Sequence, residues 1–181
     1  MLCRQGARGA MRKRPRVLFV SFVCVVLLLV GGGLYSIFAP FPADQVDDIR
    51  EVLIRAQLGG LAGRDVTIFV RFADSSEPDE SVDPSDEFFQ RLRDLNLDLR
   101  KGSESRPWPH MPKPDSPDHS MRVFVGQVKK SNLLALFLGQ IWAEVEFSGA
   151  AGPLNGEGCL YRLKKVKGNW VIQGYETLWV S

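Results

Sequence analysis

An uncharged run of twenty-three residues, 17–39, directly follows a basic N-terminal tail and constrains this chain more than any other feature. A helix rises about 1.5 Å per residue, so a run of this length spans roughly 34 Å, which exceeds the hydrocarbon core of a bilayer, about 30 Å thick. The run therefore predicts a transmembrane signal-anchor helix over residues 17–39. The remaining residues, 40–181, are expected to form one soluble domain.

The charges on the two sides of this run predict its orientation. Six basic residues and no acidic residue precede the run, whereas acidic residues open its other side. Because short basic flanks stay in the cytoplasm, residues 1–16 are predicted to be a cytoplasmic tail and residues 40–181 an extracytoplasmic domain. The chain is thus expected to be a single-pass membrane protein that contacts the bilayer through residues 17–39. Met11, which opens a second basic cluster, is as good a start as Met1.

A cleaved signal peptide is the alternative interpretation of the run. Its densest part, residues 17–30, has the length of a signal-peptide core, and Gly31 and Gly33 supply a weak cleavage site. The apolar character continues through residues 34–39, and Pro40 is unfavourable directly after a cleavage point, so an uncleaved anchor is favoured. Both interpretations export the domain, which would be secreted after cleavage.

Charge and cysteine content narrow the functions of the exported domain. The whole chain has a formal charge of +2, but residues 40–181 hold 17 basic against 21 acidic residues, a net charge of −4. This domain therefore lacks the basic surplus that nucleic-acid binding requires, and no nucleic-acid partner is expected. Cys159 is its one cysteine and has no intramolecular disulfide partner, so it is predicted to be a small buried hydrophobe.

The first part of the exported domain is predicted to contain two helices and a strand. Apolar residues recur at helical spacing over 44–58, with Asp44 as the expected N-cap and two glycines at the end. The β-branched and aromatic residues 66–72 predict a strand. A second helix is expected to begin at Asp83, the predicted N-cap, because Pro84 suits a first helical position.

The second part is predicted to be rich in strands. Residues 102–120 contain five prolines and are predicted to be an irregular loop. Strands are expected where apolar and polar residues alternate, at 121–130, 141–147, 160–166 and 170–180. A tight turn at 167–169 joins the last two strands, and the Gly- and Ala-rich residues 148–158 predict a flexible hairpin loop. This order indicates an α+β domain with helices packed on one face of a curved antiparallel sheet.

The C-terminal sequence YRLKKVKGNWVIQGYETLWVS resembles the last hairpin of nuclear transport factor-like (cystatin-like) domains, which often end in a Gly turn and a Trp-initiated strand. DPSDEFFQRLRDLNLDLRKGSE, AEVEF, GCLYRL and LWVS are together similar to a group of exported or membrane-anchored bacterial proteins of uncharacterised activity. The similarity covers residues 83–104 and 141–181. It implies a cone of helices on a curved sheet. The cysteines in the Gly-rich loop of that group are absent from SGAAGPLNGEG here.

No catalytic residue, cofactor or metal site is predicted. The sequence has no phosphate-binding Gly loop, HExxH motif or nucleophile elbow. The family resemblance implies that any enzyme of this kind would use acids, histidine or tyrosine inside the cone. The candidate pocket residues are then Glu144, Glu146, Tyr161, Tyr175 and Glu176. Alternation places Glu144 and Glu146 on the solvent-facing side of their strand, which argues against catalysis.

A membrane-anchored binding or accessory domain of unknown partner is the favoured expectation, with a ligand-binding or enzymatic cone as the alternative. An exposed aromatic patch would indicate a protein partner, and a closed aromatic pocket a small ligand. Self-association is a further alternative, because Trp142 shares the solvent-facing side with Glu144 and is a candidate interface residue of a homodimer. His110 and His119 lie in the proline-rich loop at a spacing that is not typical of metal ligands.

Overall fold

The computed structural model describes residues 39–73, 80–105, 120–131, 139–152 and 155–181. The chain divides into two compact units, Met1–Ala39 and Pro40–Ser181, and the fold below is that of the second. Within the described residues, no helix is both long and apolar enough to cross a bilayer.

Some of the predicted features lie outside the described residues. They are the cytoplasmic tail 1–16, the transmembrane segment 17–39 apart from Ala39, and both histidines of the proline-rich loop, His110 and His119.

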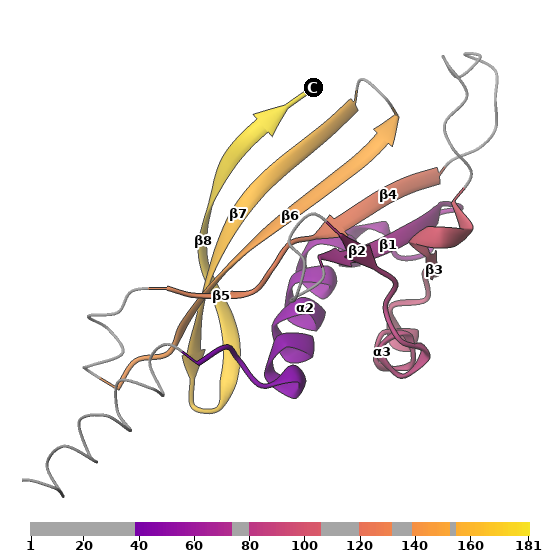
Figure 1. Cartoon of the computed structure of the whole chain (residues 1–181). Coiled ribbons are helices and arrows are strands. Elements are labelled where there is room, and N and C mark those ends of the chain that lie inside the picture. The colour runs from indigo at the N-terminus through magenta and orange to yellow at the C-terminus, as the bar shows by residue number, and fades with distance from the viewer. Residues whose placement is uncertain (1–38, 74–79, 106–119, 132–138, 153–154) are drawn as a thin grey trace, which may run out of the picture. The chain divides into compact units, whose positions relative to one another are not determined.

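The predicted α+β class is confirmed by a mixed sheet and two α-helices in the described part of the chain (Figure 1). The helices are α2 (Ala43–Leu58) and α3 (Asp86–Arg91), and the 3₁₀ turns are η1 (Gly59–Leu61), η2 (Arg93–Leu95) and η3 (Gly102–Glu104). The strands are β1 (Thr67–Ala73), β2 (Ser81–Val82), β3 (Asp98–Lys101), β4 (Ser120–Val125), β5 (Lys129–Ser131), β6 (Trp142–Gly152), β7 (Asn155–Val166) and β8 (Asn169–Val180).

The sheet is mixed rather than antiparallel as predicted. Its strand order is β2-β1-β4-β6-β7-β8, with β3 beside β1 and β5 beside β6. Strands β4 to β8 form the expected antiparallel meander, but β1 runs parallel to both β3 and β4. A parallel neighbour needs a long connection, and the chain between β1 and β4 supplies one through α3 and β3. Periodicity identifies strands but not their neighbours, so this part of the prediction was wrong.

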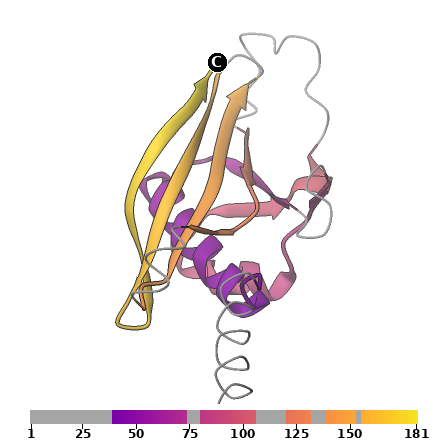
Figure 2. The ribbon, with the colours of Figure 1, turned by 60° about the vertical axis from the view of Figure 1, so that its left-hand side comes forward.

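The hydrophobic core lies between the concave, inner face of the sheet and the two helices, which lie on one side of it (Figure 2). The predicted apolar stripe of α2 is confirmed, because Ile49 and Leu53 are fully buried. The predicted alternation in β6 is also confirmed, with Ala143 and Val145 fully buried. The buried side chains of α2 therefore pack against the alternate residues of the sheet that face them.

The two predicted N-caps differ from those observed. Helix α3 begins after Ser85, whose hydroxyl accepts a hydrogen bond from the Phe88 N–H at 3.2 Å. The Asp83 carboxylate instead accepts hydrogen bonds from the backbone N–H and the hydroxyl of Ser103. Pro42, not Asp44, precedes the first turn of α2. In both helices the predicted N-cap was wrong. For α3, both Asp83 and Ser85 suit the position, and the contact with Ser103 occupies the Asp83 carboxylate; for α2, no side chain caps the first turn.

The β6–β7 hairpin is longer than predicted. Strand β6 continues to Gly152 and β7 begins at Asn155, so the predicted flexible loop 148–158 is mostly strand. Small residues usually indicate a loop, but here Gly158 leaves room for the large side chain of Trp179, which lies against it. The predicted tight turn between β7 and β8 is confirmed, with Lys167 at φ 50° and Gly168 at φ 88°, both in the left-handed region.

Candidate functional site

The face of the sheet turned away from the helices, here called the outer face, carries a continuous row of side chains across the strands. The registers place Trp179 of β8 beside Gly158, Gly158 beside Ser148, Ser148 beside Phe124, and Phe124 beside Arg71 of β1. Neighbours in such a row lie about 5 Å apart. The row therefore joins an indole at one edge to a guanidinium at the other.

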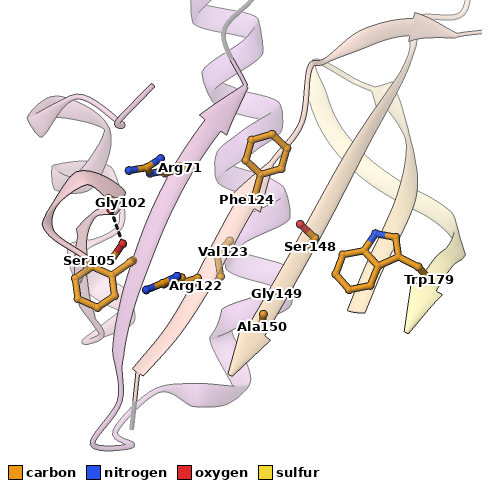
Figure 3. A pocket seen from close by; sticks show the side chains of 11 residues that line it. Arg71, Gly102, Ser105, Arg122, Val123, Phe124, Ser148, Gly149, Ala150 and Trp179 are labelled. Atoms are coloured by element: carbon orange, nitrogen blue, oxygen red, sulfur yellow. Dashed lines mark hydrogen bonds between the residues drawn. The ribbon is translucent and has the colours of Figure 1, made fainter. Parts of the chain in front are cut away.

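An open groove of about 420 Å³, here called the outer groove, lies along this row. Figure 3 shows Trp179 on one side, the small residues of β6 in the middle, and Phe124 with two arginines on the other side. The side chains that define it are Phe69, Arg71, Arg122, Phe124, Ser148 and Trp179. Among the residues that the structure describes, none that lines the outer groove is acidic.

Trp179 owes its position to the absence of a side chain at Gly158. A Cβ atom on Gly158 would come within 2.2 Å of Trp179 Nε1 and 2.5 Å of Cε2, far inside van der Waals contact. The indole therefore lies flat against the backbone of β7, and it stays 42% exposed. Glycine is required here by the close approach of a side chain.

The arginines occupy diagonal positions on neighbouring parallel strands. Phe69 pairs with Arg122, so Arg71 lies two residues further along β1 on the same face. Long side chains at diagonal positions reach one another. Burial, and secondly the charge of Arg71, lower the pKa of the Arg122 guanidinium. The site thus holds two like charges close together in a partly desolvated place.

Arg71 is also fixed by packing and by polar contacts. Its Nη1 donates a hydrogen bond to the Ser81 hydroxyl at 3.2 Å, and its stem crosses Gly102. Burial alone would raise the pKa of the Asp83 carboxyl, but the Ser103 hydrogen bonds and the charges of Arg71 and Lys101 outweigh burial and lower it. Asp83 therefore balances part of the Arg71 charge without lining the groove.

Replacing Gly102 with alanine is expected to displace Arg71. The new Cβ would lie 2.0 Å from Arg71 Cγ, the near end of the side chain, so the whole stem must move. Overpacking of this kind costs about 1–3 kcal/mol, which urea unfolding followed by pulse proteolysis would measure. Gly60→Ala is the matched control, because Gly60 also lies in a 3₁₀ turn and has no atom within 4 Å of its Cβ position. Equal unfolding midpoints for the two variants would contradict the contact.

Three of the predicted candidate residues lie elsewhere on the outer face. Glu144 accepts a hydrogen bond from Arg162 Nε at 3.2 Å, and Glu176 one from Arg162 Nη2 at 3.5 Å. Trp142 is half-buried, with the Lys164 ammonium 5.4 Å from its ring centroid. These residues form an ion-paired region next to the outer groove, where each carboxylate already has a cationic neighbour.

The two tyrosine candidates lie on the inner face. Tyr161 and Tyr175 stack with ring centroids 5.5 Å apart and an interplanar angle of 26°. Burial, with the neighbouring Cys159, raises the pKa of the Tyr161 hydroxyl to about 12. The predicted residues therefore divide between opposite faces of the sheet and do not line one pocket.

A second, inner groove of about 310 Å³ lies beside these tyrosines, beyond the end of α2. Cys159 is buried there, as predicted, and its thiol donates to a Glu157 carboxylate oxygen at 3.2 Å. Burial, with this carboxylate, raises the pKa of the Cys159 thiol. A thiol held protonated is a poor nucleophile. Within the described ranges, no three His, Cys, Asp or Glu side chains gather as a metal site would require.

None of the candidate site residues predicted from the sequence lines the outer groove. Trp179 stood in a predicted strand, but only the register shows that it lies opposite Gly158. The chain matches no protein-family model, no curated protein and no solved structure.

Proposed function

We propose that this chain is a membrane-anchored extracytoplasmic accessory domain that binds a protein partner at the outer groove. The anchor and the orientation rest on the uncharged run 17–39 and on the six basic residues before it. The curved sheet with α2 on its inner face supports the finer proposal of a nuclear transport factor-like cone.

The binding function is inferred from the position of the exposed apolar side chains in the sheet. Most of the large exposed hydrophobic residues of the described chain lie on β8, the strand that carries Trp179: Val171, Tyr175, Leu178, Trp179 and Val180. Their side chains divide between the two faces of the sheet, with Trp179 in the outer groove and Val180 in the inner groove, so β8 exposes apolar surface on both faces, as a strand that binds a partner would. Beside it, the outer groove combines Trp, Phe and Arg, the residue types enriched at the energetic centres of protein interfaces.

Two alternatives have narrower support. The inner groove, with Cys159 and Tyr161 on its wall, favours a small ligand in the cone. Self-association through Trp142 remains a prediction, and loss of a dimer in Trp142→Ala would test it. The Lys164 ammonium lies over the Trp142 ring, so this side chain is already partly covered by its own sheet.

Site-specific photo-crosslinking in cells tests the proposed function. A photoreactive amino acid at Glu176, exposed on the outer face next to Trp179, is expected to crosslink the full-length chain to one reproducible protein. The control position is Lys129, also exposed and on the outer face, but three strands away from β8 and two cross-strand rows from the groove. Tags belong at the N-terminus, because Ser181 exchanges backbone hydrogen bonds with Gly156 close to the groove. The same pattern of products from both positions would contradict the proposal.

A further inference from the structure

Strand β8 forms a free edge of the sheet (Figure 1). It stands last in the strand order, and within the described chain it pairs with β7 alone. A free edge presents unpaired backbone N–H and C=O groups, to which another strand can add. The exposed side chains of β8 lie on both faces of the sheet, with Trp179 in the outer groove and Val180 in the inner groove. A partner seated on one face would contact only one of these sets, whereas a strand added beside β8 would contact both.

The composition of β8 distinguishes it from the other free edges of the described sheet. Soluble proteins protect such edges with short strands, charged side chains and proline. Strand β2 has two residues, β5 has the three residues KKS, and β3 has the four residues DLRK. Strand β8 has twelve residues, no proline and a single charged residue, Glu176. Among these edges, the β8 edge alone lacks all three features.

A second copy of this chain is the occupant that the β8 edge fits best. Two copies that pair about a two-fold axis present the same strand to each other, so one set of residues serves both sides. Each β8 strand is already extended, and pairing therefore orders no new segment, unlike the binding of a flexible peptide. Two copies anchored in one bilayer, as the proposed function has them, would also meet at a high effective concentration.

Two bulges in β8 limit the register in which such copies can pair. The register with β7 skips Gln173 and Leu178. Each bulge changes which residues point to the outer face, and antiparallel copies must place residues of the same face opposite each other. An axis through Gly174, for example, would set Val171 of the outer face opposite Thr177 of the inner face. That register is therefore excluded.

An axis through Tyr175 satisfies this condition. It places Tyr175 opposite itself on the inner face and Val171 opposite Trp179 on the outer face. Aromatic and β-branched residues form favourable cross-strand pairs. Glu176 then lies opposite Gly174, also on the outer face. An axis through Glu176 matches the faces as well, but it sets two carboxylates directly opposite each other, which is destabilising.

We propose that two copies of this chain pair through the free edge of β8, antiparallel, about a two-fold axis at Tyr175. The inference goes beyond the proposed function, because it concerns the edge of β8, which the outer groove meets at Trp179. It shares with that function only the anchor in the bilayer. Since the axis is normal to the sheet, the outer faces of both copies lie on the same side. Their two outer grooves then open on one continuous sheet.

Thiol crosslinking of the full-length chain in lipid vesicles tests this register. The parent chain carries Cys3→Ala and Cys24→Ala, and it keeps Cys159, which is buried. A short bifunctional maleimide is expected to join two copies of Tyr175→Cys, because the two positions face each other across the axis. Val171→Cys is the matched control, since it is exposed on the same strand but its two copies would lie eight residues apart, about 27 Å. Equal dimer yields from the two positions would overturn the inference.

Charge exchange at the axis tests the same interface without covalent chemistry. Tyr175→Lys and Tyr175→Glu each set like charges opposite each other, and each alone is expected to weaken dimerisation at least about tenfold. Energy transfer between N-terminally labelled chains in the vesicles measures this loss. A mixture of the two variants is expected to dimerise again, because opposite charges then pair. This recovery would also show that both variants remain folded. Val166→Lys, an exposed change on β7, is the matched control.

The remaining outcomes separate this inference from the other interfaces. No recovery in the mixture, or equal weakening by Val166→Lys, would overturn it. A dimer that is lost in Trp142→Ala but unaffected by the Tyr175 variants would place the interface on the sheet face instead. If Glu176 captures a different protein while the chain stays monomeric, the proposed function stands and the inference fails. If the β8 dimer forms and Glu176 captures only a second copy, the inference stands and the proposed function fails.

Discussion

Trp170→Ala is expected to lower the free energy of unfolding of the exported domain by about 3–5 kcal/mol. The side chain is only 5% exposed and packs edge-to-face on Phe41, with centroids 5.5 Å apart and an angle of 88°. Truncation leaves a large cavity where the start of β8 meets the segment that leads into α2. Small domains have only about 5–15 kcal/mol of stability in total, so this one change removes a large share. Pulse proteolysis of the full-length chain across a urea series measures the loss.

Trp170→Phe separates packing from hydrogen bonding at the same position. The Trp170 Nε1 atom is buried and has no hydrogen-bond partner, a condition that costs about 1–3 kcal/mol. Phenylalanine keeps an aromatic ring and removes the unpaired donor, so the loss in packing is partly offset. A much smaller change than in Trp170→Ala is therefore expected. If the two variants unfold at the same urea concentration, the cavity is not the cause of the loss.

The sequence predicted the elements well where burial follows a simple period. The stripe through Ile49 and Leu53 and the alternation through Val145 depend only on which face of one helix or one strand meets the core. The tight turn at Lys167 and Gly168 is equally local, because two left-handed residues require it. Each of these features is decided within a few consecutive residues, and each was confirmed.

The outer groove was not predictable because no local pattern specifies it. It exists because five strands share one register from Arg71 to Trp179, and because β1 lies parallel to β4. The parallel pairing depends on a connection whose path periodicity does not reveal. The composition was misleading as well: Gly158 looked like a loop residue, although it is a strand residue beneath an indole. The alternation that identified strands β7 and β8 also places the predicted candidates Tyr161 and Glu176 on opposite faces of the sheet.

Gly158→Val is expected to remove Trp179 from the outer groove while the sheet remains folded. Valine is favoured in strands, but its Cβ would overlap the indole, so the ring must swing away from β7. The indole N–H resonance of Trp179, assigned with Trp179→Phe, is expected to shift to a solvent-exposed position. The photo-crosslink from Glu176 to the partner is expected to fall by about tenfold or more, because tryptophans at the centre of an interface often contribute about 2 kcal/mol or more.

Gly174→Val is the matched control for this prediction. Gly174 lies on the neighbouring strand β8, and no atom lies within 4 Å of the position its Cβ would occupy. The same gain in side-chain volume should therefore leave both the Trp179 resonance and the crosslink from Glu176 unchanged. A loss of crosslinking in Gly174→Val equal to that in Gly158→Val would show that strand rigidity, not the position of the indole, controls the groove. An unchanged Trp179 resonance in Gly158→Val would contradict the close approach itself.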